Sequence, residues 1–415
     1  MSQRIAIIGA GISGLSAAWY LAREHQVEVF EKNEYLGGHT CTVPVSRPHG
    51  EYQVDVGFIV FNDRTYPHYL ALLDELNVGR QPTKMGFAVS NQATGLEYCG
   101  DGLGGVFAQK RNVLRPGHWR LIADILRFNR QAPALLETAE GEMPLGEYLR
   151  RHRYSEAFRR DYILAMGGAI WSCSLAQMEA FPARFFVRFF QHHGLLSLTN
   201  RPQWYVVPGG SQRYVEALVS ACPAKFHCQA QVQQVRRDQQ GVRVTVNGQE
   251  RRFDQVIMAC HSDQARQLLI NPSAQEAAAL AALDYQPNDV VLHTDVSLLP
   301  KRQRVWSSWN ALLFEGQQER IQVTYNMNIL QGLQAPETFC VTLNAGDRIA
   351  EDKILARFQF DHPLFTPTSV AAREALLADN GRGGLWFAGA WCRNGFHEDG
   401  VFSALQVVNA LRGQS

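Results

Sequence analysis

The chain has 415 residues, 46% of them hydrophobic, and a formal net charge of +1. This length suits two or three domains with a sizeable core, and the near-zero net charge gives no global indication of a nucleic-acid partner. The eight cysteines include no Cys-x-x-Cys pair, so the sequence carries no zinc or thioredoxin-type motif and we expect no metal.

The first 31 residues form a dinucleotide-binding fingerprint. Residues 4–8 predict a buried parallel strand. The run Gly9-Ala10-Gly11-Ile12-Ser13-Gly14 predicts a tight turn that opens a helix over residues 15–23, and residues 27–30 predict a second strand. Strand, glycine turn, helix and strand in this order predict a Rossmann-like unit that binds a dinucleotide.

Each glycine of this fingerprint, and the acidic residue after the second strand, has a physical role. Gly9 permits the tight turn, Gly11 lets the backbone approach a pyrophosphate, and Gly14 lets the helix pack closely on the strand. Glu31 lies 22 residues after Gly9, where a carboxylate accepts ribose hydroxyls and would repel a 2′-phosphate. The pattern therefore favours FAD or NAD over NADP.

The next elements differ in character along the chain. A second glycine turn lies at residues 35–40. Residues 54–61 predict a strand with a glycine break, and residues 66–77 predict a helix with one apolar face. Residues 81–203 are rich in helix formers, arginine and aromatic residues. This change of composition predicts a second domain inserted into the first.

The second half of the chain alternates between strands and helices. Residues 206–211 form another glycine turn, which opens a helix over residues 212–220. Strands are predicted over residues 230–236, 242–246, 253–260, 290–294 and 321–325. A strand over residues 385–389 and a closing helix over residues 400–411 suit a parallel α/β layer completed by the end of the chain.

The order of these motifs resembles one flavoprotein superfamily. The matching residues are Gly9-x-Gly11-x-x-Gly14, Glu31, Gly37-Gly38, Pro208-Gly209-Gly210 and Gly389-x-Trp391. In this order they resemble the flavin-containing amine oxidase and phytoene desaturase superfamily. Residues 395–400 resemble a narrower group of bacterial predicted NAD/FAD-binding proteins, which is associated with modification of membrane fatty acyl chains.

The resemblance spans the whole chain and implies its fold. We expect an α/β protein, α+β overall, with a Rossmann-like FAD-binding domain of the p-hydroxybenzoate-hydroxylase and amine-oxidase type and an interleaved substrate domain. The FAD-binding domain would comprise residues 1–80, 204–272 and 381–415. The substrate-binding domain would comprise residues 81–203 and 273–380.

The resemblance also implies contacts to FAD. Those to the pyrophosphate, ribose, ribityl chain and adenine would come from Gly9, Ala10, Gly11, Ser13, Gly14, Glu31, Gly38, His39, Thr40 and Val232. Those to the isoalloxazine would come from Gly389, Trp391, Glu398, Gly400 and Val401. The N–H groups that open the last helix would face flavin N1 and O2, where they would stabilise the negative charge of reduced flavin.

Two departures from the amine oxidases count against a standard member of that branch. His39 replaces the arginine usual after the paired glycines. Residues 288–294 carry valine near the position where amine oxidases often hold a lysine beneath flavin N5.

Aromatic residues are concentrated in residues 181–190. At helical spacing they cover one broad face, which suits either core packing or the wall of an apolar substrate tunnel. Such rings could also enclose an amine by cation–π contact, so aromatic content alone leaves the substrate open.

Two histidines are candidate catalytic residues. His397 is a candidate proton carrier beside the flavin, because imidazole titrates near neutral pH; the alternative is a loop residue that shapes the flavin pocket. His293 is either an active-site residue on its strand or a core histidine. Asp399 is expected to be the N-cap of the last helix.

These features predict an FAD-dependent oxidoreductase that abstracts a hydride from an apolar substrate and desaturates a fatty acyl chain. One alternative is a flavin amine oxidase acting on a polyamine or aryl-alkyl amine, and another is a non-catalytic FAD-bound partner of a lipid-modifying enzyme. Residues 162–178 form an uncharged run shorter than the roughly 20 residues of a bilayer span. We expect a cytoplasmic protein with peripheral contact to the inner membrane face and no nucleic-acid partner.

Overall fold

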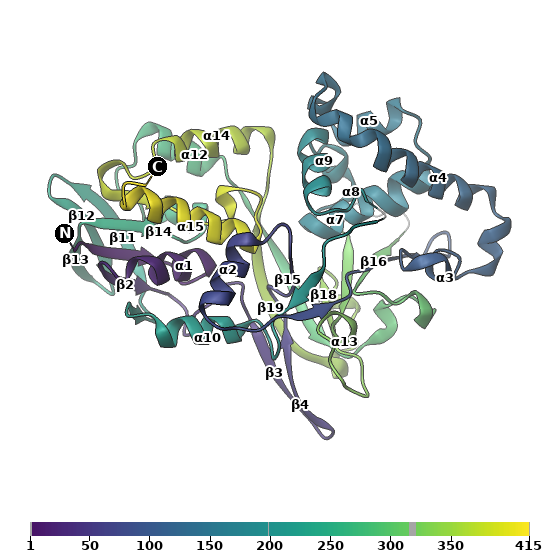
Figure 1. The fold of residues 1–415 in the computed structure, drawn as a ribbon, viewed down its shortest axis with the longest axis horizontal. Helices are drawn as coiled ribbons and strands as arrows, with labels where there is room; N and C mark the ends of the chain where they lie inside the picture. Colours follow the sequence, from purple (N-terminus) through teal and green to yellow (C-terminus); the bar gives the residue numbers. More distant parts are fainter. Residues whose placement is uncertain (1, 198, 315–320, 415) are drawn as a thin grey trace.

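The computed structural model describes residues 2–197, 199–314 and 321–414, and the chain builds two main sheets with a helical lobe at one end (Figure 1). The first sheet has five strands in the order β10-β2-β1-β14-β20, all parallel. Their bounds are Lys225–His227, Gln26–Phe30, Arg4–Ile8, Gln255–Met258 and Leu385–Phe387.

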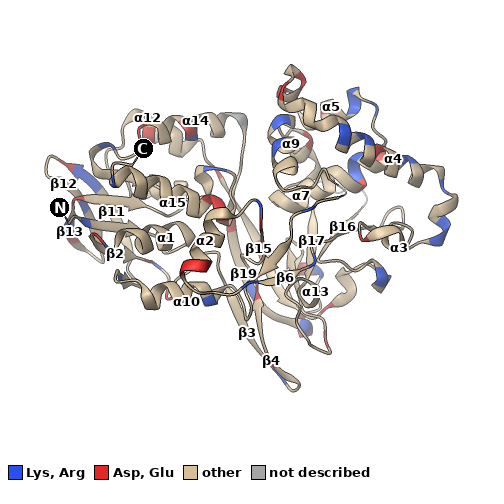
Figure 2. Cartoon of the chain, viewed as in Figure 1, with Lys and Arg blue, Asp and Glu red and all other residues tan. Residues whose placement is uncertain are grey.

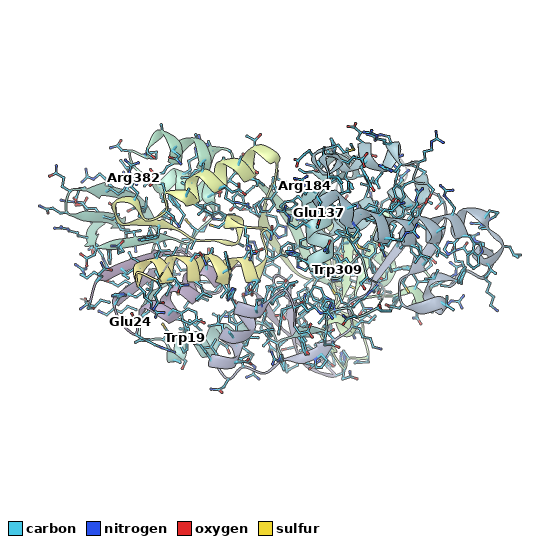
Figure 3. All side chains as sticks on the ribbon, turned by 45° about the horizontal axis from the view of Figure 1, so that its top comes forward. Trp19, Glu24, Glu137, Arg184, Trp309 and Arg382 are labelled. Atoms are coloured by element: carbon cyan, nitrogen blue, oxygen red, sulfur yellow. The ribbon has the colours of Figure 1, made fainter. Side chains whose placement is uncertain are left out.

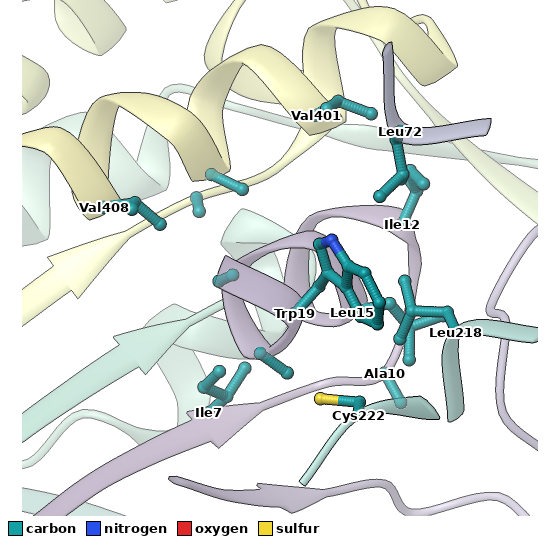
Figure 4. Packing of buried hydrophobic residues seen from close by; sticks show 14 of the residues in the cluster. Ile7, Ala10, Ile12, Leu15, Trp19, Leu72, Leu218, Cys222, Val401 and Val408 are labelled. Atoms are coloured by element: carbon teal, nitrogen blue, oxygen red, sulfur yellow. The ribbon is translucent and has the colours of Figure 1, made fainter. Parts of the chain in front are cut away.

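Both faces of this sheet are covered. Ile5 and Ile7 of β1 pack among helices α1 (Ile12–Leu21), α10 (Gln212–Ala221) and α15 (His397–Leu411), and Figure 4 shows this layer. Ala6 and Ile8 face the opposite way. There they meet a three-stranded sheet and neighbouring helices, which are β11 (Val232–Asp238), β12 (Gly241–Val246), β13 (Gln249–Phe253), α11 (Ser262–Leu268), α12 (Ala274–Ala281) and α14 (Pro367–Ala378). Burial on both faces explains the unbroken apolar run of β1.

The second sheet has seven strands in the order β19-β15-β18-β17-β16-β7-β8. All neighbours are antiparallel except β16 and β7. The bounds are Ile354–Pro363, Tyr285–His293, Cys340–Leu343, Gln322–Asn326, Trp309–Leu313, Phe87–Asn91 and Leu96–Cys99.

The helical lobe packs on the β16 and β17 end of this sheet, where Ala311, Leu313 and Val323 join its aromatic core. Its helices are α3 (Gly102–Val106), α4 (Pro116–Gln131), α5 (Leu145–Arg151), α6 (Glu156–Phe158), α7 (Leu164–Trp171), α8 (Leu175–Glu179) and α9 (Ala183–His192). None of the helices described in the structure is long and apolar enough to cross a membrane.

The strands of the first sheet lie within residues 1–80, 204–272 and 381–415, and those of the second lie within residues 81–203 and 273–380. Whether these segments behave as separate domains stays a prediction. The smaller elements are α2 (Pro67–Glu75), α13 (Met327–Leu330), the hairpin of β3 (Thr42–Arg47) and β4 (Gly50–Asp55), and a small sheet of β5 (Phe61–Asn62), β9 (Trp204–Val206) and β6 (Gln81–Thr83).

Two sequence predictions about these elements are wrong. The strand expected over residues 54–61 ends at Asp55, and the chain bends at Gly57, where a Cβ would overlap the His39 carbonyl oxygen. The last helix begins at His397 rather than at residue 400, and its N-cap is Phe396. Asp399 instead accepts the Phe396 N–H at 3.0 Å from inside the first turn.

Candidate functional site

The glycine turn between β1 and α1 has the geometry of a phosphate-binding loop. Gly9 has φ +102°, and its N–H donates to the Phe30 carbonyl at 2.9 Å. A Cβ at Gly14 would overlap the Gly9 carbonyl oxygen, so the loop itself requires this glycine. A Cβ at Gly11 would meet no atom within 4 Å. Gly11 therefore borders open volume at the N-terminus of α1, where phosphate groups bind.

The second glycine turn lies directly against this loop. Gly37 donates its N–H to the Ala10 carbonyl at 2.9 Å, and a Cβ at Gly38 would lie 3.0 Å from the Gly11 Cα. The positive φ of Gly38, +60°, and this close approach both favour glycine. His39 and Thr40 are thereby brought beside the open volume at Gly11.

Glu31 is buried at the end of β2 and held by the backbone. Its two carboxylate oxygens accept the N–H groups of Ala10 and Asn33, each at 2.9 Å. Each oxygen keeps a free lone pair, with which it can accept a ribose hydroxyl. The Ala230 N–H donates to the Glu31 carbonyl at 2.8 Å, which brings the start of β11, and so Val232, close to this end of the site.

The N-terminus of α15 meets the N-terminus of α1. A Cβ at Gly400 would lie 2.6 Å from Ile12 Cγ2 and 2.9 Å from Ser13 Oγ, so only glycine allows this contact. Val401 is fully buried beside it. Two helix N-termini thus direct their positive ends into one region, which favours an anionic ligand.

Gly389 and Trp391 border this region through the backbone. The Gly389 N–H donates to Ser403 Oγ at 2.9 Å. The Trp391 indole is buried, folds over Gly389 and donates to the Cys260 carbonyl at 3.1 Å. Its ring belongs to the core beneath the sheet, so the part of Trp391 available to a ligand is its backbone.

Glu398 holds helix α2 in place. Its carboxylate accepts the N–H groups of His68 and Tyr69 at 3.0 and 2.9 Å, in the first turn of that helix. Burial raises the pKa of Glu398 to about 7. The side chain therefore caps α2, and a contact to the flavin predicted for this residue would come from its backbone.

His397 lies in a hydrogen-bonded chain that the sequence did not reveal. Its ring stacks on Phe58, with centroids 3.6 Å apart and planes at 7°. Its Nε2 is 2.9 Å from the Tyr214 hydroxyl, which is 2.6 Å from Thr40 Oγ1. Burial holds the pKa of His397 well below its usual value, and His39 lowers it further. His397 is therefore neutral, with Nε2 tied to Tyr214.

His293 does not join this site. It is fully buried in the seven-stranded sheet, where its Nε2 lies 2.7 Å from Thr342 Oγ1 and its Nδ1 accepts the Asp295 N–H at 3.1 Å. Both ring nitrogens are satisfied within the core, and burial lowers the pKa of His293 to about 4. These contacts favour the core alternative for His293, and its role as a catalytic residue stays a prediction without support from its surroundings.

A stack of rings that the sequence analysis missed lies beside the phosphate loop. His39 stacks on His261 with centroids 5.6 Å apart, and His261 stacks on Tyr285 at 4.4 Å. Burial lowers the pKa values of both histidines to about 4. The Nδ1 atom of His261 is buried and has no hydrogen-bond partner among the residues that the structure describes.

These features fit FAD on three independent observations. Gly11 faces open space at a helix N-terminus, which suits a diphosphate, Glu31 suits a ribose, and the buried His261 Nδ1 lacks a partner that a ligand would supply. Within the described residues, no group of three or more His, Cys, Asp or Glu side chains could hold a metal ion.

The family model for flavin-containing amine oxidoreductases matches residues 12–308. The chain belongs to this family. FAD is its cofactor, as the sequence predicted, and the family's members are flavin-containing oxidoreductases, which is the predicted enzyme class.

Two curated relatives match parts of the chain. A putative flavin-containing monoamine oxidase, AofH of Mycobacterium tuberculosis, is 28% identical over 258 residues, which cover 58% of this chain and 53% of AofH. A 1-hydroxycarotenoid 3,4-desaturase of Flavobacterium is 42% identical over 76 residues, 18% of this chain and 14% of the desaturase. The match therefore spans about half the length of AofH and less of the desaturase.

Solved structures share the fold over the full chain. A fatty acid isomerase from P. acnes that produces CLA has a TM-score of 0.70 at 15% identity, over 98% of both chains. Cyclohexylamine oxidase from Brevibacterium oxydans has a TM-score of 0.70 at 16% identity, over 99% of this chain and 100% of that one. These likenesses confirm the predicted fold class.

Proposed function

We propose that this chain desaturates a long acyl chain, with bound FAD accepting a hydride from an apolar C–H bond. The observation that carries this proposal is an aromatic wall that reaches the N-terminus of α15. Phe189 of α9 stacks on Phe396 with centroids 4.9 Å apart, and Phe396 directly precedes His397. An apolar substrate lying on this wall would approach the flavin end of the site.

The wall extends away from His397 along α9. Phe185 stacks on Phe365 at 6.0 Å, and Trp171 contacts both Phe181 and Phe189 at 4.8 Å. Phe185 and Trp171 remain half-buried, although most of the lobe's aromatic side chains are buried. Apolar surface left incompletely covered inside the fold suits a chain of methylene groups, whose burial contributes about 0.8 kcal/mol each.

Two tryptophans near this wall have unused hydrogen-bond donors. Trp171 Nε1 and Trp309 Nε1 are buried, and neither has a partner among the described residues; Figure 3 labels Trp309 near the middle of the molecule. A buried donor without a partner costs about 1–3 kcal/mol. A carboxylate or ester oxygen would satisfy these donors, whereas a protonated amine offers only further donors. This difference favours an acyl substrate over an amine.

The chain's own residues would position the substrate and hold protons. The neutral imidazole of His397, fixed at Nε2 by Tyr214, presents its remaining nitrogen for proton transfer, and the chain continues to Thr40. The aromatic wall excludes water from the reacting C–H bond. The fatty acid isomerase and the carotenoid desaturase, among proteins similar to this chain, are compatible with this substrate class.

The test is anaerobic bleaching of the flavin in purified holoprotein. Membrane lipid extract, a polyamine, benzylamine and NADH are added separately, and flavin absorbance is followed. Bleaching by lipid with new double bonds in the product supports the proposal. Bleaching by an amine alone overturns it in favour of an amine oxidase, and bleaching by NADH alone indicates a reductase. No bleaching by any reductant favours an FAD-bound partner of a lipid-modifying enzyme.

A matched pair of variants tests the role of the indole donors. Trp171→Phe keeps an aromatic ring and removes the orphaned N–H, so we expect a higher KM for an acyl substrate with little change in kcat. The control is Trp386→Phe, because Trp386 Nε1 donates to Gln255 at 2.8 Å in the five-stranded sheet. Equal effects of the two variants would contradict a role of the Trp171 N–H in substrate binding.

A further inference from the structure

The exposed large apolar side chains of the molecule are concentrated in one segment of the helical lobe. Leu103 and Leu114 are 78% and 87% exposed. Val113, Trp119 and Leu126 are each about half exposed. Outside this segment, only Tyr35 and Val296 are comparable among the described residues, at about 40%. A concentration of this kind marks an interaction surface.

Contacts tie together the segments that carry these side chains. The Trp119 ring lies 5.1 Å from that of Phe107, and its Nε1 donates to the Val113 carbonyl at 2.8 Å. Phe107 in turn donates its N–H to the carbonyl of Leu103. The patch therefore runs from α3, through the turn that carries Leu114, to the first turns of α4.

Helix α4 has two different faces. His118, Leu121, Asp124 and Phe128 are buried against the lobe. The outward face carries Trp119, Ala123, Leu126 and Arg130, which follow one another at helical spacing. The core-facing side is already packed, and the outward side keeps Trp119 and Leu126 about half exposed.

Basic residues are concentrated in the same segment of the chain. Residues 102–131 contain six basic side chains and one acidic side chain, Asp124, although the whole chain has a net charge of +1. Asp124 is buried and paired with Arg120 and Arg127 at 3.2 and 3.1 Å. The remaining basic residues are Lys110, Arg111, Arg115 and Arg130, all exposed. Figure 2 shows Lys and Arg along this lobe, at the end of the molecule away from the N-terminus.

We propose that the α3–α4 surface, residues 102–131, docks on the surface of a bilayer that contains anionic phospholipid. Leu103, Leu114 and Trp119 would enter the headgroup region while the arginines and Lys110 contact lipid phosphates. Exposed apolar side chains interspersed with exposed basic ones along one segment suit this interface, in which binding scales with buried apolar area and electrostatic attraction. The proposal goes beyond the proposed function, because the docking surface is independent of which substrate reduces the flavin.

The test is cosedimentation of the holoprotein with vesicles of phosphatidylcholine alone or with 30% phosphatidylglycerol added. We expect binding to the anionic vesicles that weakens on the order of tenfold or more as salt is raised from about 0.1 to 0.5 M. Equal binding to both vesicle types would overturn the proposal, as would no binding to either. If the holoprotein binds neither vesicle type and instead self-associates through the patch, the patch is an interface with a second copy of the chain.

Variants locate the surface. A triple variant that removes three basic side chains, Lys110→Gln/Arg111→Gln/Arg115→Gln, should weaken binding to anionic vesicles on the order of a hundredfold. A double variant that removes apolar side chains, Leu103→Ser/Leu114→Ser, should weaken it on the order of tenfold. The control, Arg236→Gln/Arg266→Gln/Arg382→Gln, removes the same charge from exposed positions on the other half of the molecule and should bind as wild type. Equal loss in the control would overturn the location. Flavin content and thermal unfolding confirm that each variant is folded, and flavin bleaching is measured separately, so failure of the substrate proposal leaves this test intact.

Discussion

Helices α1 and α4 show how differently the two halves of the molecule use a helix. Nine of the ten residues of α1 are buried, and only Tyr20 is partly exposed. Helix α4 buries one face and exposes an apolar and basic one. A helix enclosed on all sides can meet a ligand only at its end, whereas a helix at the surface offers a face. The first arrangement suits a diphosphate, and the second suits an extended surface.

The same contrast separates the two kinds of site. The phosphate loop depends on residues a few positions apart in sequence, and its geometry follows from backbone conformation at three glycines. The ring stack joins His39 and His261, from two separate connecting segments, to Tyr285 of β15. The Thr40–Tyr214–His397 chain joins the second glycine turn to helices α10 and α15. Substitutions in the local phosphate loop should therefore have the largest effects, and substitutions in the assembled hydrogen-bonded chain and ring stack should have smaller ones.

The largest effect is expected in the phosphate loop. Gly11→Val places its side chain in open volume, so the protein should fold but lose FAD affinity by more than about a hundredfold, or about 3 kcal/mol. Gly14→Val should fail to fold, because its Cβ would overlap the Gly9 carbonyl oxygen. Circular dichroism and FAD titration separate the two outcomes. A folded, yellow Gly11→Val protein would show that the phosphates bind elsewhere.

An intermediate effect is expected at His397. Replacing it by Gln should slow flavin reduction by the substrate that bleaches wild type, on the order of a hundredfold, as removal of a proton carrier does. Tyr214→Phe should slow reduction less and shift its pH profile, because Nε2 of His397 loses its partner. Rapid-mixing absorbance under anaerobic conditions measures both.

His293→Gln is the matched control for this experiment. His293 is as buried as a core residue and bonded to Thr342, so its replacement should lower the free energy of unfolding by about 1–3 kcal/mol. The rate of flavin reduction should stay at the wild-type value. An unchanged rate in His397→Gln as well would return His397 to a purely structural role.

The sequence predicted the cofactor half well because its signals are local. The bounds of β1 are those predicted, and the glycine turn, β2 and α1 follow with small shifts at their ends. A boundary shifted where a side-chain hydrogen bond to the backbone decided it. Helix α15 begins three residues early because the Asp399 carboxylate bonds back to Phe396, which reverses the capping arrangement expected from the sequence.

The ring stack could not be predicted, because nothing in the sequence links residues 39, 261 and 285. They meet only when β1 pairs with β14 and β15 crosses the end of that sheet. The same reason explains His293: strand alternation could not decide whether it faced the core or the site. Glu398 likewise gained its partners from α2, whose position depends on the whole fold.

The smallest effect is a pH dependence of FAD binding through His39 and His261. Burial lowers both pKa values to about 4, so these histidines are neutral in the free protein near pH 7. His261 also lowers the pKa of His39, and His39 in turn lowers the pKa of His397, since neighbouring rings repel when charged. The other groups that face the pair are Tyr285, His362, Asp361 and Lys32.

A bound diphosphate adds negative charge beside these rings and so raises their pKa values in the complex. The complex then binds more protons than the free protein, and FAD affinity should fall as pH rises through the raised values, by at most about tenfold per pH unit for each proton taken up. Calorimetry in two buffers of different ionisation enthalpy measures the proton uptake directly. His261→Gln should flatten the pH dependence of FAD binding. His293→Gln is the control and should leave it unchanged: burial also lowers the pKa of His293 to about 4, but this residue lies inside the other sheet. A dissociation constant that stays flat from about pH 4 to pH 8 in the wild type would place the stack outside the diphosphate's reach, leaving the glycine loop and the two helix N-termini to hold the phosphates alone.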